Sequence, residues 1–323
     1  MASVAQALVS RAIDFVSPGN EKGKLSILIY HRVLQEYDPF LAGDVTVEEF
    51  DWQLALLSKY FNVLPLGEAV DRLNSSSLPP RAVCITFDDG YADNEENALP
   101  LLKKYDLPAT FFIATAYIEN GCMWNDRIIE SIRGCREAEL SFNEVQLDSL
   151  SLASDDLKIT AINKLIGKIK YLPYEHRNDV VDAIVEKTGT PLPDNLMMSK
   201  AQVKKLFDAG MTIGAHTHNH PILTQLSDLS AQEEIDKGRK LLEDWSGEKV
   251  DLFAYPNGKR GVDYDDRHVE IVKRLGFSAS VSTDWGYSTA ATDLFQLYRF
   301  TPWDRKPFMF AARLLKNLAS NNI

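Results

Sequence analysis

The chain carries two adjacent carboxylates, Asp88 and Asp89, in the sequence TFDDGY at residues 86–91. The apolar run at 82–85 predicts a buried strand, and polar residues just past such a strand lie where α/β proteins bind ligands. Side chains alternate along a strand, so the two carboxylates diverge unless the backbone bends, which Gly90 permits. A bend would let one carboxylate bind a metal ion while the other takes up a proton. An ordinary Asp-Asp-Gly turn is the alternative.

A second polar cluster, HTHNHP at residues 216–221, follows another predicted strand at 211–214. His216 and His220 are four residues apart, which brings two imidazoles to one side of a compact loop. Two histidines and one carboxylate are a common ligand set for a catalytic zinc ion, with water in the open position. Three of the six histidines of the chain fall within five residues, which core packing does not explain. We predict that His216 and His220 bind a metal ion, with His218 the weaker candidate.

In this order, the two motifs resemble the first two motifs of the polysaccharide deacetylase family, which includes chitin-oligosaccharide, peptidoglycan and exopolysaccharide deacetylases. The resemblance covers residues 25–300, apart from an insertion. It implies a distorted (β/α) barrel and metal-dependent removal of acetyl groups from N-acetylated sugars. It also implies that Asp88 is the general base and that the backbone N–H of Tyr91 helps to stabilise the oxyanion. The implied metal ligands are Asp89, His216 and His220.

The later motifs depart from the family pattern. The third motif is usually Arg-x-Pro-aromatic-Gly, whereas this chain has AYPNG at 254–258, so no arginine orients the base from there. We expect Tyr255 and Asn257 of this motif to contact the substrate. The late Leu-x-His motif, whose histidine is the general acid, is matched only by LYR at 297–299. Arginine cannot donate a proton usefully near neutral pH, so the acid must come from elsewhere.

Two other residues are candidates for the missing roles. His31 follows a predicted strand at 25–30 and would lie at the catalytic edge of the barrel. The sequence YHR at 30–32 resembles the N-terminal Tyr-His motif of exopolysaccharide-modifying deacetylases, which implies that His31 is the general acid; a packed histidine is the alternative. Arg299 could orient Asp88. Both assignments are hypotheses.

Three tryptophans, Trp124, Trp285 and Trp303, lie in predicted loops. Exposed tryptophans stack on sugar rings in carbohydrate sites, but most tryptophans belong to the core, so the two interpretations are equally weighted. We therefore include all three as candidate substrate contacts.

Strands and helices alternate along the chain up to residue 113 and again from residue 199. This alternation indicates a parallel sheet, and seven or eight units favour a distorted (β/α)7–8 barrel. Residues 122–198 show helical patterns without a convincing strand. We predict one α/β domain over residues 1–323, with a helical insertion over 122–198 at the barrel rim.

The formal charge of 35 − 46 = −11 argues against a nucleic-acid partner. The three cysteines have no Cys-x-x-Cys spacing, which favours a reducing compartment, the cytoplasm, over a disulfide framework. No apolar run is long enough to cross a membrane. An apolar helical stripe at 4–16 is a poor signal peptide because no basic segment precedes it. With Arg11 as its only cation, we expect it to pack on the domain, and peripheral membrane contact is the weaker alternative.

These observations predict a metal-dependent hydrolase that removes acetyl groups from N-acetylated sugars. The predicted substrate is a bacterial polysaccharide or its lipid- or nucleotide-linked precursor. The expected cofactor is a divalent cation, zinc first, with cobalt, manganese or nickel as alternatives. The alternatives in function are an O-deacetylase, a hydrolase of non-sugar amides on the same metal site, and a catalytically silent carbohydrate-binding relative.

Overall fold

The computed structural model describes residues 11, 13–119, 121–142 and 145–320. Within these residues, seven parallel strands lie side by side in the order β1 (Leu25–Tyr30), β5 (Ala82–Phe87), β6 (Thr110–Ile113), β9 (Thr212–Ala215), β10 (Leu252–Ala254), β11 (Ala279–Trp285) and β12 (Leu297–Arg299). A further short strand, β4 (Asn62–Val63), pairs with the start of β5. All seven run in the same direction, so their carboxyl ends meet at one edge.

The sheet curls until its last strand reaches its first. The N–H of Phe300, just after β12, donates to the carbonyl of Ile27 at 2.7 Å, and the N–H of Ile29 donates to the carbonyl of Phe300 at 3.0 Å. Strands β1 and β5 are buried along their whole length, as expected for parallel strands that are covered on both faces. The predicted (β/α) barrel is therefore confirmed, as a nearly closed barrel of seven strands.

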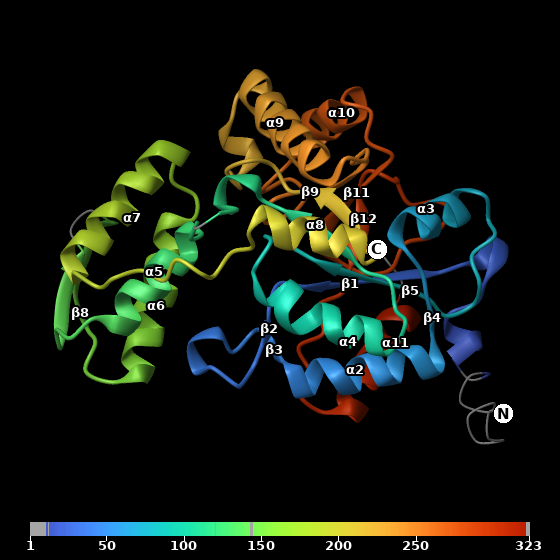
Figure 1. Cartoon of the computed structure of the whole chain (residues 1–323), viewed down its shortest axis with the longest axis horizontal. Helices are drawn as coiled ribbons and strands as arrows, with labels where there is room; N and C mark the ends of the chain where they lie inside the picture. The colour runs from blue at the N-terminus through green and yellow to red at the C-terminus, as the bar shows by residue number, and fades with distance from the viewer. Residues whose placement is uncertain (1–10, 12, 120, 143–144, 321–323) are drawn as a thin grey trace.

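Helices surround the barrel (Figure 1). They are α2 (Val47–Tyr60), α3 (Leu66–Asn74), α4 (Leu99–Lys104), α8 (Lys200–Asp208), α9 (Asp228–Ser246), α10 (Asp266–Arg274) and α11 (Pro307–Ala319). A capping box begins α2, because Thr46 and Glu49 accept hydrogen bonds from each other's backbone N–H groups. Two short strands, β2 (Val33–Leu34) and β3 (Val45–Thr46), pair beside the barrel rim.

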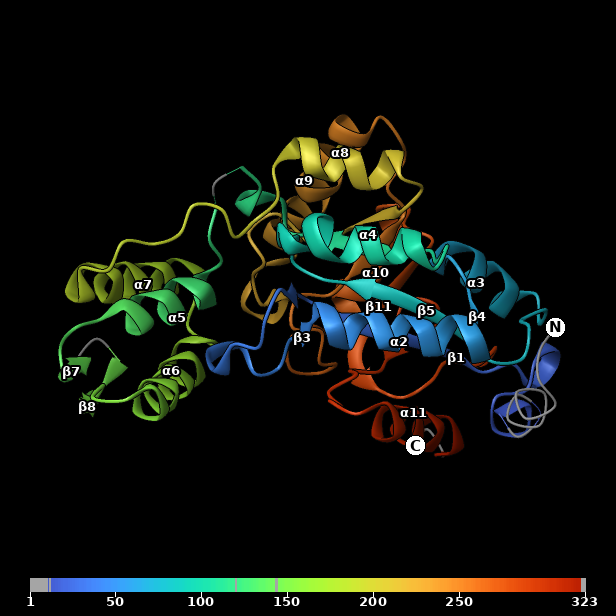
Figure 2. The same cartoon turned by 60° about the horizontal axis from the view of Figure 1, so that its bottom comes forward.

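The insertion forms a separate lobe beside the barrel (Figures 1 and 2). Its elements are α5 (Trp124–Gly134), β7 (Glu139–Phe142), β8 (Leu147–Ser151), α6 (Asp155–Ile169) and α7 (Tyr174–Thr188). The three helices pack around their own apolar core. The prediction that this region lacks strands was wrong, since β7 and β8 form an antiparallel hairpin. The sequence pattern concealed it because both strands are short and only partly buried, with serine and aspartate between the few leucines.

Most of the predicted N-terminal helix at 4–16, and with it the proposed membrane contact, lies outside the described residues. Among the residues that the structure does describe, no helix is both long and apolar enough to cross a membrane.

Candidate active site

A cavity of about 500 Å³ opens where the carboxyl ends of the barrel strands face the insertion. On the barrel side it is lined by His31, Asp88, Asp89, His216, His220 and Asn257, among others. On the insertion side it is lined by Trp124, Asn125, Asp126, Ile129, Ile166 and Lys170. The two motifs found in the sequence therefore meet in one cavity, and the insertion forms its opposite wall.

The backbone bends at the two aspartates, as it must if both carboxylates are to face the same cavity. Asp89 has φ of 76° and Gly90 has φ of 99°, both in the left-handed region. A Cβ atom at position 90 would also lie 3.0 Å from the side chain of Ile113, so glycine is needed for space as well as conformation. His220 and Asn257 also have positive φ, at 50° and 59°. Strained conformations thus gather around this cavity, as they do at functional sites.

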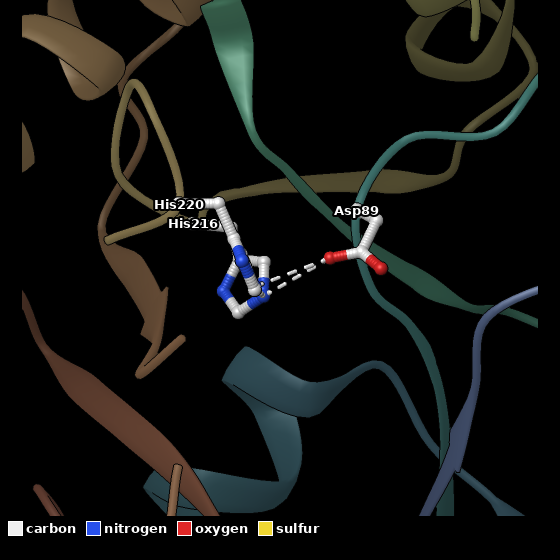
Figure 3. Close-up of side chains that lie close together, drawn as sticks. All are labelled: Asp89, His216 and His220. Atoms are coloured by element: carbon white, nitrogen blue, oxygen red, sulfur yellow. Dashed lines mark hydrogen bonds and ion pairs between the residues drawn. The ribbon is translucent and has the colours of Figure 1, made fainter. Parts of the chain in front are cut away.

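Asp89, His216 and His220 form a compact buried triad (Figure 3). Asp89 Oδ1 lies 3.5 Å from His216 Nε2 and 3.4 Å from His220 Nε2. The two Nε2 atoms are 3.2 Å apart. Asp89 Oδ1 is buried and accepts no hydrogen bond from the described residues. A buried, unsatisfied carboxylate oxygen that faces two imidazole nitrogens fits a divalent cation of the zinc type, so the residues present suit the predicted metal.

The environment of each histidine prepares it to act as a ligand. His216 Nδ1 donates to the carbonyl of Ala254 at 2.7 Å, which directs Nε2 toward Asp89. Burial lowers the pKa of His220 to about 3, so its imidazole is neutral. Burial also opposes the charging of His216, but Asp88 and Asp89 raise its pKa above the usual value. A bound cation would take the place of that proton.

The loop that carries the histidines is held by Glu234 on α9. One carboxylate oxygen accepts from the backbone N–H groups of His218 and Asn219 at 3.2 and 2.7 Å, and the other accepts from the Asn219 amide at 2.6 Å. His218 Nδ1 lies 2.9 Å from Thr115 Oγ1, away from the triad. His218 therefore supports the loop, which agrees with its weaker ranking as a ligand.

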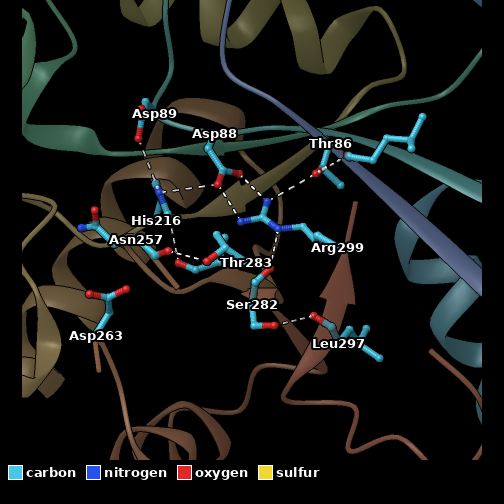
Figure 4. A network of polar contacts seen from close by, with 12 residues as sticks. Thr86, Asp88, Asp89, His216, Asn257, Asp263, Ser282, Thr283, Leu297 and Arg299 are labelled. Carbon is cyan, nitrogen blue, oxygen red and sulfur yellow. Dashed lines mark hydrogen bonds and ion pairs between the residues drawn. The ribbon is translucent and has the colours of Figure 1, made fainter. Parts of the chain in front are cut away.

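Arg299 binds Asp88 with both of its terminal nitrogens (Figure 4). Both distances are 2.7 Å, and Arg299 Nε donates to the carbonyl of Ser282 at 2.7 Å. Both side chains are buried. Burial opposes ionisation of Asp88, yet Arg299 and His216 hold its pKa below the ordinary value. The structure thus brings Arg299 to the place that the hypothesis required, and Asp88 is ionised and fixed in orientation.

Tyr91 and His31 also lie at this cavity. The backbone N–H of Tyr91 makes no hydrogen bond to any described residue, so it remains available as a donor. His31 lines the cavity together with Asp44, a carboxyl group whose pKa is raised to about 6 by burial against the opposing effect of His31 and Arg32. The acid and oxyanion candidates therefore line the same cavity.

Of the two candidate substrate contacts in the third motif, only one lies at the cavity. Asn257 lines the cavity, and its Nδ2 is buried without a partner in the described structure. Tyr255 does not, and the prediction that its side chain contacts substrate was wrong. The Tyr255 ring is fully buried and stacks on Tyr264 at 3.8 Å, while its hydroxyl donates to the carbonyl of Phe295 at 3.1 Å. Motif position alone could not reveal that the side chain alternates into the core.

The three tryptophans also differ in whether they line the cavity. Trp124 lines the cavity but is only 5% exposed, with the guanidinium of Arg177 over its ring at 4.9 Å. Trp285 and Trp303 are exposed and lie with ring centres 5.7 Å apart. Neither lines the cavity, although Thr283, two residues before Trp285, does. Their contact with substrate stays a prediction.

The sequence analysis missed Asp126, which lines the cavity from the first turn of α5. It also missed Asp44 and Glu234. None of the three has a motif around it; Asp44 and Asp126 come from elements outside both motifs, whereas Glu234 lies only 15 positions after Asn219, in the helix that follows the histidine loop. The one available signal was the position of Asp126 beside Trp124 and Asn125 in a polar segment.

Comparison with known proteins decides the family. The sequence profile described as polysaccharide deacetylase matches residues 75–280, more than half of the chain. The chain belongs to the polysaccharide deacetylase family. This confirms the resemblance seen in the two motifs, both of which fall inside the matched region.

Bacterial proteins are similar in sequence to this chain. YxkH of Bacillus subtilis is 23% identical over 281 residues, which cover 85% of this chain and 70% of YxkH. A poly-β-1,6-N-acetyl-D-glucosamine N-deacetylase of Staphylococcus epidermidis is 35% identical over 111 residues, 30% of this chain and 38% of that enzyme. The match to the staphylococcal enzyme therefore spans well under half of its length.

Two solved structures share the fold of this deacetylase-family chain. The deacetylase PplD of Streptococcus pyogenes, solved with acetate, has 23% identity and a TM-score of 0.62, with 92% of this chain and 99% of PplD covered. IcaB of Ammonifex degensii has 20% identity and a TM-score of 0.59, with 94% and 98% covered. The whole architecture, and not only the matched profile region, is thus shared with these structures.

Proposed function

We propose that this protein hydrolyses the acetamide of N-acetylglucosamine residues in a bacterial polysaccharide, or in its lipid- or nucleotide-linked precursor, with a divalent cation as cofactor. The observation that carries this proposal is the buried Asp89, His216 and His220 triad beside the Asp88–Arg299 pair in one cavity. Membership of the polysaccharide deacetylase family supports the reaction class. The named activity of the staphylococcal relatives supports the sugar.

The residues divide the reaction between them. A divalent cation held by Asp89, His216 and His220 would polarise the amide carbonyl and lower the pKa of water. Asp88, ionised and oriented by Arg299, takes a proton from the water as its oxygen adds to the carbonyl carbon. The free N–H of Tyr91 donates to the oxygen that becomes negative.

His31 completes the proposed reaction. The C–N bond can break only as the sugar nitrogen gains a proton, because a free amide anion is a poor leaving group. From the cavity wall, His31 gives that proton to the nitrogen, so the products are acetate and the amino sugar. Asp44 lines the cavity together with His31, and its carboxyl group interacts electrostatically with the imidazole.

Removal of the metal tests the first half of this assignment. Treatment with a chelator is expected to lower acetate release from β-1,6-linked N-acetylglucosamine oligomers at least ~100-fold, since the cation supplies several kcal/mol. Zinc, cobalt, manganese or nickel should restore it. The His220→Ala variant should lose bound metal by elemental analysis, whereas His218→Ala, the matched control in the same loop, should keep it. Full activity of the chelated protein would overturn the metal-dependent mechanism, and bound metal with no release from any acetylated sugar would favour a silent binding protein.

The general acid is tested by leaving-group dependence. His31→Ala is expected to lower kcat on the N-acetyl substrate by about 10²–10⁴-fold because general acid catalysis is lost. The loss should be much smaller on an O-acetylated sugar, whose alkoxide leaves more easily than an amide. His176→Ala, at an exposed position of α7, is the control. An equal loss on both substrates would show that His31 acts in some other way.

We also propose that the protein works in a reducing compartment such as the cytoplasm. The three cysteines, Cys84, Cys122 and Cys135, are all free thiols, and Cys84 and Cys135 are buried. Cell fractionation with an antibody to the protein tests this placement.

A further inference from the structure

Both ends of the insertion form hydrogen bonds with the segment Gly90-Tyr91-Ala92. At the end of the insertion, Met198 N–H donates to the carbonyl of Gly90 at 3.0 Å, and Leu196 accepts from the N–H of Ala92 at 2.8 Å. At its beginning, Asp126 Oδ2 accepts a hydrogen bond from the hydroxyl of Tyr91 at 2.9 Å. The residue whose N–H is left free is thus held on both sides and at the tip of its side chain.

The Tyr91 ring is also fixed from the barrel side. Tyr91 is buried, with 3% of its surface exposed, and the guanidinium of Arg32 lies 4.8 Å from the centre of its ring. Arg32 Nε in turn donates to Asp93 Oδ2 at 2.8 Å. Asp93 also accepts from the N–H of Val33 at 3.1 Å. The hydrogen bond to Asp126 fixes the Tyr91 ring, and it adds a third attachment to the two backbone hydrogen bonds at Gly90 and Ala92 that hold the peptide with the free N–H.

Asp126 is buried, yet it lines the catalytic cavity. The charged or titratable groups around it are Arg32 after β1, Asp89 and Tyr91 after β5, Glu130 on its own helix and the thiol of Cys122. Burial raises the pKa of Asp126 to about 7, with Arg32 and the Tyr91 hydroxyl acting against the shift. Burying a carboxyl group with a raised pKa costs free energy, which a purely structural hydrogen bond does not require. Groups of this kind are typical of functional sites.

We propose that Asp126 is a positioning residue for the deacetylation reaction. By accepting the hydrogen bond of the Tyr91 hydroxyl, it holds the Tyr91 N–H where the oxyanion forms, so the insertion takes part in catalysis as well as in forming the cavity wall. This inference rests on the proposed function. The inference goes beyond the proposed function because it gives a role in catalysis to the insertion, which lies outside the barrel.

Kinetics of three variants test the link. Asp126→Leu and Tyr91→Phe are each expected to lower kcat by ~10–100-fold, because a misdirected oxyanion donor loses part of the 10²–10³-fold that such a donor supplies. KM and bound metal should change little. The double variant should be no slower than the worse single variant, since both remove the same hydrogen bond. Asp126→Asn, which keeps an acceptor oxygen, should restore most of the activity. Fully multiplicative effects in the double variant would overturn the proposal.

A matched control separates positioning from loosening of the lobe. Arg133 of the insertion pairs with Asp38 of the barrel side at 2.7 Å, and this contact does not involve Tyr91. Asp38→Asn therefore weakens the attachment of the insertion without touching the oxyanion donor, and it should leave kcat unchanged. If Asp38→Asn and Asp126→Leu lower kcat equally, the effect is attachment alone and the proposal fails.

The pH profile gives a signature that a structural role would not produce. Above the pKa of Asp126 the ionised carboxylate is the stronger acceptor for the Tyr91 hydroxyl, and below it the neutral acid is weaker. Wild-type kcat should therefore fall by an additional step as the pH drops through about 7. The step should be absent in Asp126→Asn, which does not titrate. Identical pH profiles for the two proteins would contradict the assignment.

Amide hydrogen exchange provides a readout that does not require turnover. Exchange in a peptide over residues 88–98 should speed up in Asp126→Leu and Tyr91→Phe but not in Asp38→Asn. Unchanged exchange in the first two variants overturns the positioning role. A wild-type protein that releases no acetate overturns the proposed function instead, and the exchange result then decides separately whether Asp126 holds this segment.

Discussion

Asp88→Asn is expected to lower kcat for acetate release by about 10²–10⁴-fold while the bound metal remains in place. The amide cannot take a proton from water, but it keeps the shape of the carboxylate. Because Asp89, His216 and His220 are unchanged, elemental analysis should still find the metal. Steady-state kinetics with N-acetylglucosamine oligomers, together with the metal content, check this prediction.

The chain offers a close control for this variant. Asp304 is buried and accepts from Arg313 through both carboxylate oxygens, at 2.6 and 3.0 Å, and it lies outside the catalytic cavity. Asp304→Asn breaks the same kind of bidentate pair, so it should lower the free energy of unfolding without slowing catalysis. If Asp88→Asn were no slower than Asp304→Asn, Asp88 would not be the base.

Arg299→Met is expected to move the acidic limb of the kcat/KM profile to higher pH and to lower activity throughout. In the native protein Arg299 holds the pKa of Asp88 down against the effect of burial. Without the guanidinium, burial dominates, the pKa rises, and a larger fraction of Asp88 is protonated and inactive at any given pH. The base works only when ionised, so activity is lost first on the acidic side. Profiles of kcat/KM measured from pH 5 to 9 in wild type and variant would show the displacement.

The same variant should also destabilise the fold. Removing one partner of a buried ion pair costs about 3–5 kcal/mol, because the remaining charge is left uncompensated. Urea denaturation should show this loss, and Arg313→Met, at a half-exposed pair, should show less. Arg299→Lys retains the charge but not the two-pronged contact, so it should lie between wild type and Arg299→Met. An unmoved acidic limb in Arg299→Met would mean that Arg299 does not tune the base.

Local sequence patterns were sufficient for the main barrel strands and for the two polar motifs that meet in the cavity. Buried parallel strands are continuous apolar runs, so the strands that end at Asp88 and near His216 could be recognised without the fold. The caps at Thr46 and Ser199 are short-range hydrogen-bond patterns of three residues, and both are present. The polar residues after the strands met in one cavity because all barrel strands run in the same direction.

The partners of these residues depended on the tertiary structure. Arg299 reaches Asp88 across 211 positions of the chain only because β12 closes the barrel against β1. Tyr255 belongs to a family motif, yet the alternation of side chains at the end of β10 turns it into the core. The hairpin of the insertion was missed because its strands are short and only partly buried.

The sequence by itself determined the family, the barrel, and the residues Asp88, Asp89, His216 and His220. The strands and the two polar motifs follow from spacing within short segments, where the physics is local. The family follows from the resemblance of those motifs, and the barrel from that resemblance together with the alternation of strands and helices along the chain. Only the tertiary structure decided that Arg299, which the sequence offered as a hypothesis, contacts Asp88, and that Asp126 of the insertion accepts the hydrogen bond of the Tyr91 hydroxyl at 2.9 Å. Such contacts join side chains of separate elements, so they depend on how the barrel closes and where the inserted lobe packs against its rim.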